Sequence, residues 1–408
     1  MVVVGALVAF CSGPGQSFVF SIFLDSIIED TGLDRTTVSA LYTVGTGISA
    51  IMVATVSRLA DRFGPRVMLG VMAFFLGVAC FSMAAATGFV AFFLAFAALR
   101  ALGQGSLPIN ATLLTATWFV ARRGRAMAMM GLGFSLSSAI LPPIVRVLIT
   151  NIGWREAYVV LGVMVWILLI PAAIFLVRNK PEDVGLHPDG FPHPPENEPD
   201  EVPRDTRGRD TRPVFSSLNF WLLAIPLATP SLVSTALVFH QTSLFADRGI
   251  SAGVAAAVFP VLALASAITS VVAGFIVDRI GPRKLFASNM LVLLLGTVLV
   301  GVISTPLAAF GYAALIGAAE GSWRVVNGVT WAHIYGRHGL GRIQGSAVMV
   351  GISAAAIGPL PLAWMRDVSG GYPAGLALLS ALCLFAMVAI FLARPERESG
   401  REPATQST

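Results

Sequence analysis

Three polar residues, Glu320, Arg324 and Asn327, lie in an apolar run that is long enough to cross a membrane. Their spacing places them on one face of an α-helix. On such a face the guanidinium of Arg324 can bind an anion, and the carboxylate of Glu320 can carry a proton. A structural ion pair that joins helices is the alternative explanation. Because ionisable residues at membrane depth are costly and mark ion or solute paths, the spacing predicts a coupling site.

Other apolar runs hold further candidates for the same cavity: Gln16, Arg100, Gln104, Asn110, His240 and Gln241. Arg100 is explained equally well as a functional and as a structural residue. Pro108 and Asn110 indicate a kinked, partly polar helix in this run. A lone histidine such as His240 is more often a satisfied packing residue than a proton switch. Trp323 is expected to pack rather than to bind.

A charged hexapeptide occurs twice, as Asp61-Arg62-Phe63-Gly64-Pro65-Arg66 and, 217 positions later, as Asp278-Arg279-Ile280-Gly281-Pro282-Arg283. A weaker echo pairs Gln104-Gly105-Ser106 with Glu320-Gly321-Ser322. Two echoes at nearly one offset predict an internal duplication. An aspartate on a tight turn can lie at the positive N-terminus of a facing helix, flanked by arginines that reach carboxylates or carbonyls. Each copy is therefore a candidate latch, with ordinary loop charges as the alternative.

The segments that carry these residues are long and apolar. Of the 408 residues, 56% are hydrophobic and 12% are charged, which excludes an ordinary soluble domain. Runs of roughly 20 apolar residues match a hydrocarbon core about 30 Å thick, and none alternates as a barrel strand would. The predicted class is an all-α polytopic membrane protein with twelve transmembrane helices. The spans are placed near 3–27, 36–57, 67–86, 89–118, 125–150, 156–177, 218–246, 252–277, 285–304, 306–335, 342–365 and 373–393.

The spans form two six-helix bundles, at 1–177 and 214–393, which are joined by a polar linker at 178–213 and followed by a charged tail at 394–408. Twenty of the 27 Lys and Arg residues fall on the linker's side of the spans, and four fall on the opposite side. Since positive loops stay in the cytoplasm, the linker and both termini are predicted to be cytoplasmic. The predicted location is the cell membrane.

Over essentially its whole length the chain resembles the major facilitator superfamily. The stretch from Gly274 to Arg283 is similar to the signature Gly-x-x-x-Asp-Arg-x-Gly-Arg-Arg, and in the first copy Ser57 stands where that family prefers Gly. The resemblance implies two pseudo-symmetric bundles, with Asp61 and Arg66 holding them together on the cytoplasmic side when the cavity opens outward. The stretch from Arg100 to Gly105 is shifted by one residue from the family's usual arginine, two spacers, Gln-Gly.

A narrower similarity is to the bacterial monocarboxylate and oxalate:formate antiporter-like branch. It is carried by Gly13-Pro14-Gly15-Gln16, Thr36-Thr37-Val38-Ser39-Ala40, Tyr335-Gly336-Arg337 with Gly341-Arg342, and Asp367-Val368-Ser369-Gly370-Gly371-Tyr372. This branch implies a monocarboxylate or similar organic anion as the solute. The eighth predicted span departs from it, because the run from Val261 to Gly274 lacks the basic residue of members with known carboxylate chemistry.

The predicted function is secondary active transport of a small organic solute, an organic anion by the resemblance, through alternating access with proton coupling. Proton-independent exchange, export of drug-like compounds and a non-transporting sensor are the alternatives. An enzyme is not expected, because the five histidines and three cysteines are scattered without catalytic or metal-binding spacing. No cofactor or nucleic-acid partner is predicted. The expected partners are the solute, a coupling proton and the lipid bilayer, for a chain that acts as a monomer.

Overall fold

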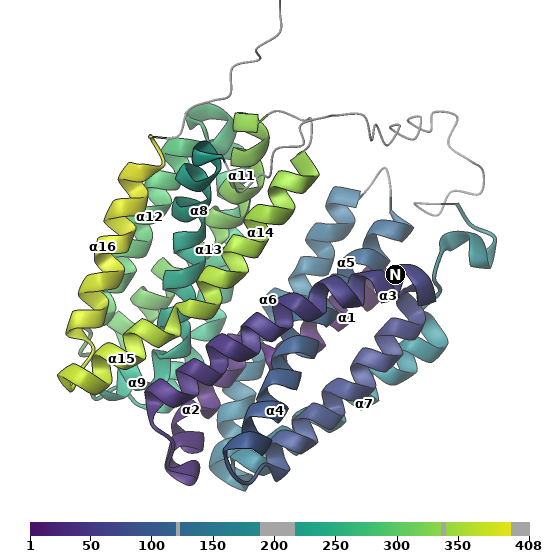
Figure 1. The fold of residues 1–408 in the computed structure, drawn as a ribbon, viewed down its shortest axis with the longest axis horizontal. Coiled ribbons are helices and arrows are strands. Elements are labelled where there is room, and N and C mark those ends of the chain that lie inside the picture. The colour runs from purple at the N-terminus through teal and green to yellow at the C-terminus, as the bar shows by residue number, and fades with distance from the viewer. Residues whose placement is uncertain (120–122, 188–216, 336–339, 393–408) are drawn as a thin grey trace, which may run out of the picture.

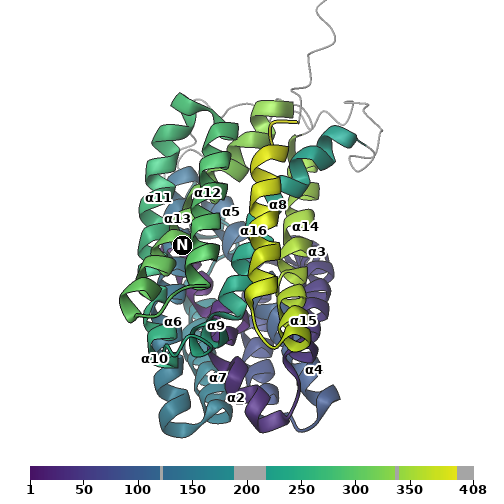
Figure 2. The same ribbon diagram turned by 90° about the vertical axis from the view of Figure 1, so that its left-hand side faces the viewer.

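The computed structural model describes residues 1–119, 123–187, 217–335 and 340–392. Every regular element in these ranges is a helix, and most of the helices run between the bottom and the top of the molecule as Figures 1 and 2 show it. The predicted all-α class is confirmed. Helices satisfy their backbone hydrogen bonds internally, which the hydrocarbon core requires of a chain that crosses it.

The first half of the chain lies on one side of the molecule and the second half on the other (Figure 1). The first half contains α1 (Val2–Cys11), η1 (Gly13–Gly15), α2 (Ser17–Thr31), α3 (Arg35–Ala85), α4 (Phe89–Leu99), η2 (Arg100–Ser106), α5 (Leu107–Trp118), α6 (Arg123–Ile152), α7 (Trp154–Pro171), η3 (Ala172–Leu176) and η4 (Pro181–Val184). The second half contains α8 (Leu218–Phe239), α9 (Gln241–Ala246), α10 (Ala252–Ala257), α11 (Phe259–Ile280), α12 (Pro282–Val300), α13 (Pro306–Tyr335), α14 (Leu340–Ile357), α15 (Pro359–Ser369) and α16 (Pro373–Ala389).

Nine helices in the described ranges are long and apolar enough to cross a membrane, and α16 is a shorter apolar helix. The predicted second and tenth spans are also helical, in α3 and α13, but are not among the nine. In α3 several side chains of the second span lie outside the described part of the structure. In α13 the ionisable residues Glu320 and Arg324 interrupt the apolar run. The predicted boundaries of the two bundles, linker and tail stay predictions, since residues 188–216 and 393–408 lie outside the described ranges.

Several predicted spans are broken rather than continuous. The first divides into α1 and α2 at a 3₁₀ turn, after which Gln16 is extended with φ −89° and ψ 153°. Pro14 and its flanking glycines explain this break, because proline lacks an N–H and glycine weakens a helix. The fourth span holds a π-helical segment, η2, between α4 and α5. Such segments are rare and occur frequently at functional sites.

The two copies of the hexapeptide form turns of the same shape. Gly64 has φ 79° and ψ 156°, and Gly281 has φ 80° and ψ 154°. Residues with a side chain rarely adopt such positive φ values, which explains the glycine in each copy. Each glycine redirects the chain between two antiparallel helical segments. In the first copy this break lies inside α3, and in the second it separates α11 from α12.

Glycines also bring the backbone of α13 against that of α11. A Cβ atom added to Gly317 would lie 2.1 Å from the carbonyl oxygen of Leu262, and one added to Gly321 would lie 2.2 Å from that of Ser266. Small residues at such crossings let membrane helices approach closely. This crossing fixes the helix that carries Glu320 relative to the second-half core.

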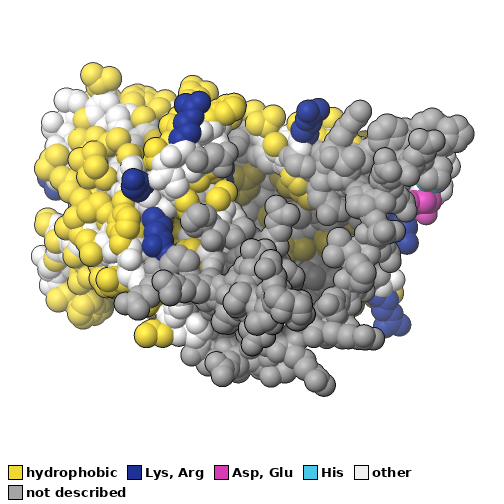
Figure 3. Space-filling model, turned by 90° about the horizontal axis from the view of Figure 1, so that it is seen from above, with side chains coloured by type: hydrophobic (Ala, Val, Ile, Leu, Met, Phe, Trp, Pro, Cys, Tyr) yellow, Lys and Arg dark blue, Asp and Glu magenta, His cyan; other side chains and the backbone are white. Residues whose placement is uncertain are grey.

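The halves contact each other at the end of the molecule that holds α9 and α15 (Figure 1). Hydrogen bonds there join Thr36 to Asp367, Ser243 to Asp25 (2.7 Å), Thr43 to the carbonyl of Ala356 (2.7 Å) and Thr242 to the carbonyl of Ser21 (3.1 Å). The other end of the molecule lies at the top of Figure 1. Seen from that end, the surface carries scattered Lys and Arg side chains (Figure 3), and Arg62, Arg125, Arg279 and Lys284 are exposed.

Candidate functional site

A cavity of about 310 Å³ lies between the two halves and is lined by residues of both. Small-molecule sites typically occupy about 300–1,000 Å³. Among the described residues that line it, Glu320 and Arg324 are the ionisable ones. Its other polar lining residues are Gln16, Ser17, Gln104, Ser135, Ser138, Ser231, Ser234, Thr235, Ser266 and Asn327. The aromatic lining residues are Phe18, Phe134, Phe259, Trp323 and Trp331.

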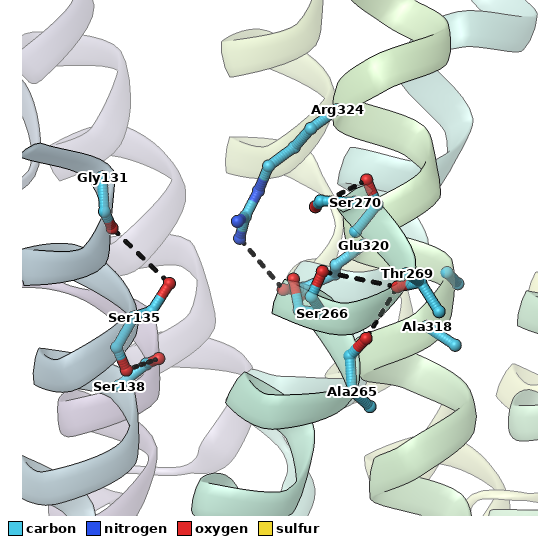
Figure 4. Close-up of polar contacts among 12 residues, drawn as sticks. Gly131, Ser135, Ser138, Ala265, Ser266, Thr269, Ser270, Ala318, Glu320 and Arg324 are labelled. Atoms are coloured by element: carbon cyan, nitrogen blue, oxygen red, sulfur yellow. Dashed lines mark hydrogen bonds and ion pairs between the residues drawn. The ribbon is translucent and has the colours of Figure 1, made fainter. Parts of the chain in front are cut away.

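The charged groups of Glu320 and Arg324 lie near each other on α13. Nη2 of Arg324 is 3.7 Å from Oε2 of Glu320, whereas charge-assisted hydrogen bonds are about 2.7–2.9 Å long. The side chain of Arg324 is 44% exposed and that of Glu320 is 25% exposed. Figure 4 shows Arg324 extending from α13 into the space between the halves, on the side of Ser135 and Ser138. The pair is therefore loose, and both partners are accessible to a solute.

The second-half wall around this pair is held in place by hydrogen bonds. The indole Nε1 of Trp323 donates to the carbonyl of Leu227 in α8 at 2.9 Å, and that of Trp331 donates to Oδ1 of Asn327 at 3.2 Å. Ser266 in α11 is 2% exposed, and its hydroxyl has no hydrogen-bond partner among the described residues. A buried hydroxyl without a partner is costly, so a ligand group that bonds to it would be stabilising.

The first-half wall is polar but uncharged. Ser138 in α6 donates its hydroxyl proton to the carbonyl of Ser135 at 2.9 Å, and Ser135 makes a long contact of 3.5 Å to the carbonyl of Gly131 (Figure 4). Gln104 in η2 has a buried Oε1 with no hydrogen-bond partner among the described residues. Gln16 donates to a hydroxyl at 3.3 Å and to a carbonyl at 3.4 Å. This wall therefore offers neutral oxygen acceptors to a solute.

Arg100 lies outside the lining of this cavity and is fully buried in the first half. Its five N–H groups have oxygen partners: Thr46 twice (3.2 and 3.1 Å), the carbonyl of Gly15 (2.7 Å), Ser17 (3.5 Å) and the hydroxyl of Tyr42 (2.9 Å). Its guanidinium carbon is also 4.3 Å from the centre of the Tyr42 ring. These contacts join the first, second and fourth predicted spans, which gives Arg100 a structural role in this conformation.

Asn110, His240 and Gln241 also lie outside the cavity lining. Nδ2 of Asn110 donates to the carbonyl of Pro65 at 3.3 Å, at the turn of the first hexapeptide. The His240 ring is 3.0 Å from the carbonyl oxygen of Pro359, and the amide of Gln241 donates to a carbonyl of α10 at 2.8 Å. Each side chain thus makes a hydrogen bond within its own half, while the buried amide oxygens of Asn110 and Gln241 have no partner among the described residues.

Arg66 of the first hexapeptide is bound to its own half. Its guanidinium donates to the carbonyls of Ala173 at 3.2 Å and Ile174 at 2.6 Å, at the end of the sixth predicted span. Its backbone N–H donates to Oδ1 of Asn179 at 3.0 Å. The predicted latch between the halves therefore stays a prediction for another conformation.

The second hexapeptide differs in its contacts. Two buried nitrogens of Arg283, Nε and Nη2, have no hydrogen-bond partner among the described residues. Arg62 and Arg279 are exposed. The side chains of Asp61 and Asp278 lie outside the described part of the structure.

Comparison with known proteins identifies the fold family. Residues 5–245 and 231–408 match the Major Facilitator Superfamily. The chain belongs to this superfamily. It is therefore a multi-pass membrane protein of a transporter family, as the apolar runs predicted and the resemblance to the family signature implied.

Curated relatives of this superfamily member transport varied solutes. A probable L-galactonate transporter of Escherichia coli (strain K12) is 31% identical over 159 residues, which are 38% of this chain and 34% of that protein. A probable sulfoacetate transporter of Cupriavidus necator is 32% identical over 168 residues, 40% of this chain and 37% of that protein. An MFS-type transporter of Gibberella moniliformis is 24% identical over 91% of this chain and 84% of that protein. The chain spans about a third of the length of the first two.

Solved structures of other superfamily members have the same fold. A bacterial homologue of the human lysosomal transporter Spinster, in an inward-facing and occupied conformation, has a TM-score of 0.76 at 15% identity over 96% of both chains. The D-xylose-proton symporter has a TM-score of 0.70 at 15% identity over 97% of both chains.

The sequence predictions missed the hydroxyl-bearing residues that line the cavity of this superfamily member. The missed residues are Ser17, Ser135, Ser138, Ser231, Ser234, Thr235 and Ser266. The spacing of Ser135 from Ser138, and of Ser231 from Ser234 and Thr235, is that of one helix face. Because serine and threonine are also frequent at membrane helix interfaces, this pattern alone does not single out a cavity.

Proposed function

We propose that the protein carries a small organic anion together with a proton across the cell membrane, with Arg324 as the anion site and Glu320 as the proton carrier. The observation that carries the proposal is the loose pair on α13. Among the described lining residues of the cavity these two are the ionisable ones, and their closest charged atoms are 3.7 Å apart. Ionisable groups in a cavity at membrane depth typically mark an ion or substrate path.

Binding of the solute anion is coupled to binding of the proton because the anion replaces Glu320 as the partner of Arg324. In the empty carrier the carboxylate of Glu320 partly neutralises Arg324. A solute anion that binds Arg324 takes the place of Glu320, and the carboxylate, left without its cation, then binds a proton more readily. Proton and anion each favour binding of the other, because linkage is reciprocal. Rocking of the halves then moves both across the membrane.

The contacts between the halves fit an alternating-access cycle. Hydrogen bonds join the halves at the end that holds α9 and α15, and the cavity lies between the halves beyond them. If the linker and termini are cytoplasmic, as the distribution of Lys and Arg predicts, this conformation faces the cytoplasm. We propose that it is the inward-facing state of a monomer.

The solute class rests on the cavity and on two relatives. Among the described residues that line the cavity, Arg324 is the one cationic side chain, and it is directed between the halves. L-galactonate and sulfoacetate, the solutes named for the two relatives, are both organic anions. Arg324 in the tenth span would take the place of the basic residue that the eighth predicted span lacks.

A second candidate is export of apolar compounds. Five aromatic side chains line the cavity, and an agnestins efflux protein of Paecilomyces divaricatus is 24% identical over 98% of this chain. Arg324 and Glu320 would then take no part in transport.

Uptake into proteoliposomes separates the two candidates. We expect labelled carboxylates or sulfonates to accumulate when an inward proton gradient is imposed, and Arg324→Ala to abolish this accumulation. Arg248→Ala, which changes an exposed arginine in the turn after α9, is the matched control. Anion uptake by Arg324→Ala at the wild-type rate would contradict the proposal.

A further inference from the structure

The two walls of the cavity differ in charge. The second half supplies both ionisable lining residues, on α13. The first half supplies five polar lining residues without charge, which are Gln16, Ser17, Gln104, Ser135 and Ser138. A solute that spans the cavity therefore meets a cation at one end and hydroxyl or amide groups at the other.

The hydrogen bonds of the first-half wall decide which solute groups fit it. Ser138 already donates its proton to a carbonyl of its own helix at 2.9 Å, so its oxygen faces a solute as an acceptor. The buried Oε1 of Gln104 is a second acceptor without a partner among the described residues. A solute hydroxyl can donate to these two acceptors, and it can also accept from the amide N–H groups of Gln16 and Gln104 on the same wall. A second carboxylate only accepts hydrogen bonds, so it would leave the oxygens of Ser138 and Gln104 without a donor.

Arg100 narrows the choice between the two kinds of donor, a hydroxyl and an ammonium group. It is fully buried behind this wall, with Nη1 3.5 Å from the hydroxyl of Ser17, and no carboxylate pairs with it in the described structure. Its positive charge opposes an ammonium group at the first-half wall. All five of its N–H groups are already bonded to protein oxygens, so it has no donor left for a second carboxylate.

We infer that the solute is a hydroxylated acid, whose anionic group binds Arg324 and whose hydroxyl groups donate to Ser138 and Gln104. The buried hydroxyl of Ser266, which has no partner among the described residues, is available on the opposite wall for a solute hydroxyl. This inference rests on the proposed function, because it takes Arg324 as the anion site. It adds that the hydroxyl groups, and not the anionic group alone, determine which acids are bound.

Calorimetric titration of the purified carrier with matched acids tests the inference. Propionate, lactate, alanine and malonate share a three-carbon skeleton and differ in the group that would face Ser138. Hexanoate, gluconate and glucarate form a second series with six carbons. We expect lactate and gluconate to bind at least roughly tenfold more tightly than propionate and hexanoate, since a site built for a hydroxyl is left unpaired by an analogue without one. Alanine, malonate and glucarate are expected to bind more weakly than the hydroxylated monoacid of their series.

Variants of Ser138 test whether the first-half wall causes the preference for hydroxylated acids. In Ser138→Ala we expect the preference for lactate over propionate to fall at least roughly threefold, while propionate binds as it does to the wild type. Ser353→Ala is the matched control, because Ser353 is exposed on α14 and donates to a carbonyl of its own helix at 2.9 Å. Thermal unfolding of each variant shows whether it is folded. Equal binding of lactate and propionate, or tighter binding of alanine or malonate, overturns the inference.

Binding of the acids to Arg324→Ala distinguishes failure of this inference from failure of the proposed function. If the variant loses all acids alike, the anion site stands whatever the hydroxyl preference is. If no acid binds the wild type, or if Arg324→Ala binds acids as the wild type does, the proposed function fails and the inference fails with it.

Discussion

The carboxylate of Asp367 in α15 accepts two hydrogen bonds from Thr36, one from its backbone N–H at 3.1 Å and one from its hydroxyl. Thr36 is the second residue of α3, so a carboxylate of the second half lies at a helix N-terminus of the first half. The free N–H groups and the positive end of the helix dipole both favour an anion at this position. This contact is one of the hydrogen bonds that hold the halves together at the end of the molecule that contains α9 and α15, which we call the closed end.

Asp367→Ala should weaken the closed end. Loss of a cap at a helix N-terminus costs about 1 kcal/mol, which is roughly a fivefold change in an equilibrium. We expect a cysteine placed at Ser135 in the cavity to react about fivefold faster with an impermeant maleimide applied from the α15 end. The native cysteines are buried and leave the signal clear. Ser369→Ala, at the end of the same helix, is the control. An unchanged rate of maleimide labelling in Asp367→Ala would show that the contact between Thr36 and Asp367 does not hold this end closed.

Glu320→Gln should separate transport from its driving force. The variant cannot release a proton from this position, but it keeps Arg324 and the shape of the cavity. We expect uptake driven by a pH gradient to fall at least roughly tenfold, while exchange of labelled for unlabelled solute stays within about twofold of the wild type. Glu156→Gln, on the exposed first turn of α7, is the control. Gradient-driven uptake that survives Glu320→Gln would place the proton path elsewhere.

Arg100→Lys should lower the stability of the protein, whereas Arg324→Lys should weaken solute binding. Lysine has three donors in place of five, so it leaves at least one of the four oxygen partners of Arg100 without this donor in a fully buried site. We expect Arg100→Lys to lower the apparent unfolding temperature by roughly 5 °C or more. Arg324→Lys, at a half-exposed position, should unfold as the wild type does but bind the solute more weakly. Thermal unfolding and calorimetry on both variants measure the two effects.

Gly317→Ala should move α13 away from α11. The added methyl group would lie 2.1 Å from the carbonyl oxygen of Leu262, and overpacking of this kind costs about 1–3 kcal/mol. We expect a lower unfolding temperature and weaker solute binding, because α13 carries the charged pair. Gly328→Ala on the same helix is the control, since no heavy atom lies within 4 Å of its added methyl group. That variant should be as stable as the wild type or slightly more stable.

The sequence predicted the fold class from apolar runs, because a run of this length has few alternatives to a membrane helix. It also predicted that Glu320, Arg324 and Asn327 share a helix face, and all three line the cavity. Their roles in transport stay predictions. Hydropathy cannot show which face of a helix meets a cavity and which meets a neighbouring helix, so Asn110 and His240 were indistinguishable from lining residues before packing was known.

Arg100 shows a second limit. Its spacing from Gln104 is one residue longer than the usual pattern, and the structure has a π-helical segment over Arg100–Ser106. A π-turn contains one residue more than an α-turn, so the additional residue is accommodated within the helix. Gln104 lines the cavity, whereas Arg100 is directed into the first-half core. Sequence spacing read on an ideal α-helix cannot give this result.

The two glycine turns separate what a duplicated segment keeps from what it changes. Gly64 and Gly281 agree within a few degrees in both backbone angles, yet Arg66 binds two carbonyls and Arg283 has buried nitrogens without a partner in the described structure. Under the internal duplication that the repeated hexapeptide predicts, both copies kept the shape of the turn, while the partners of its arginine diverged. The two copies are thus more alike in their backbone than in their side-chain contacts.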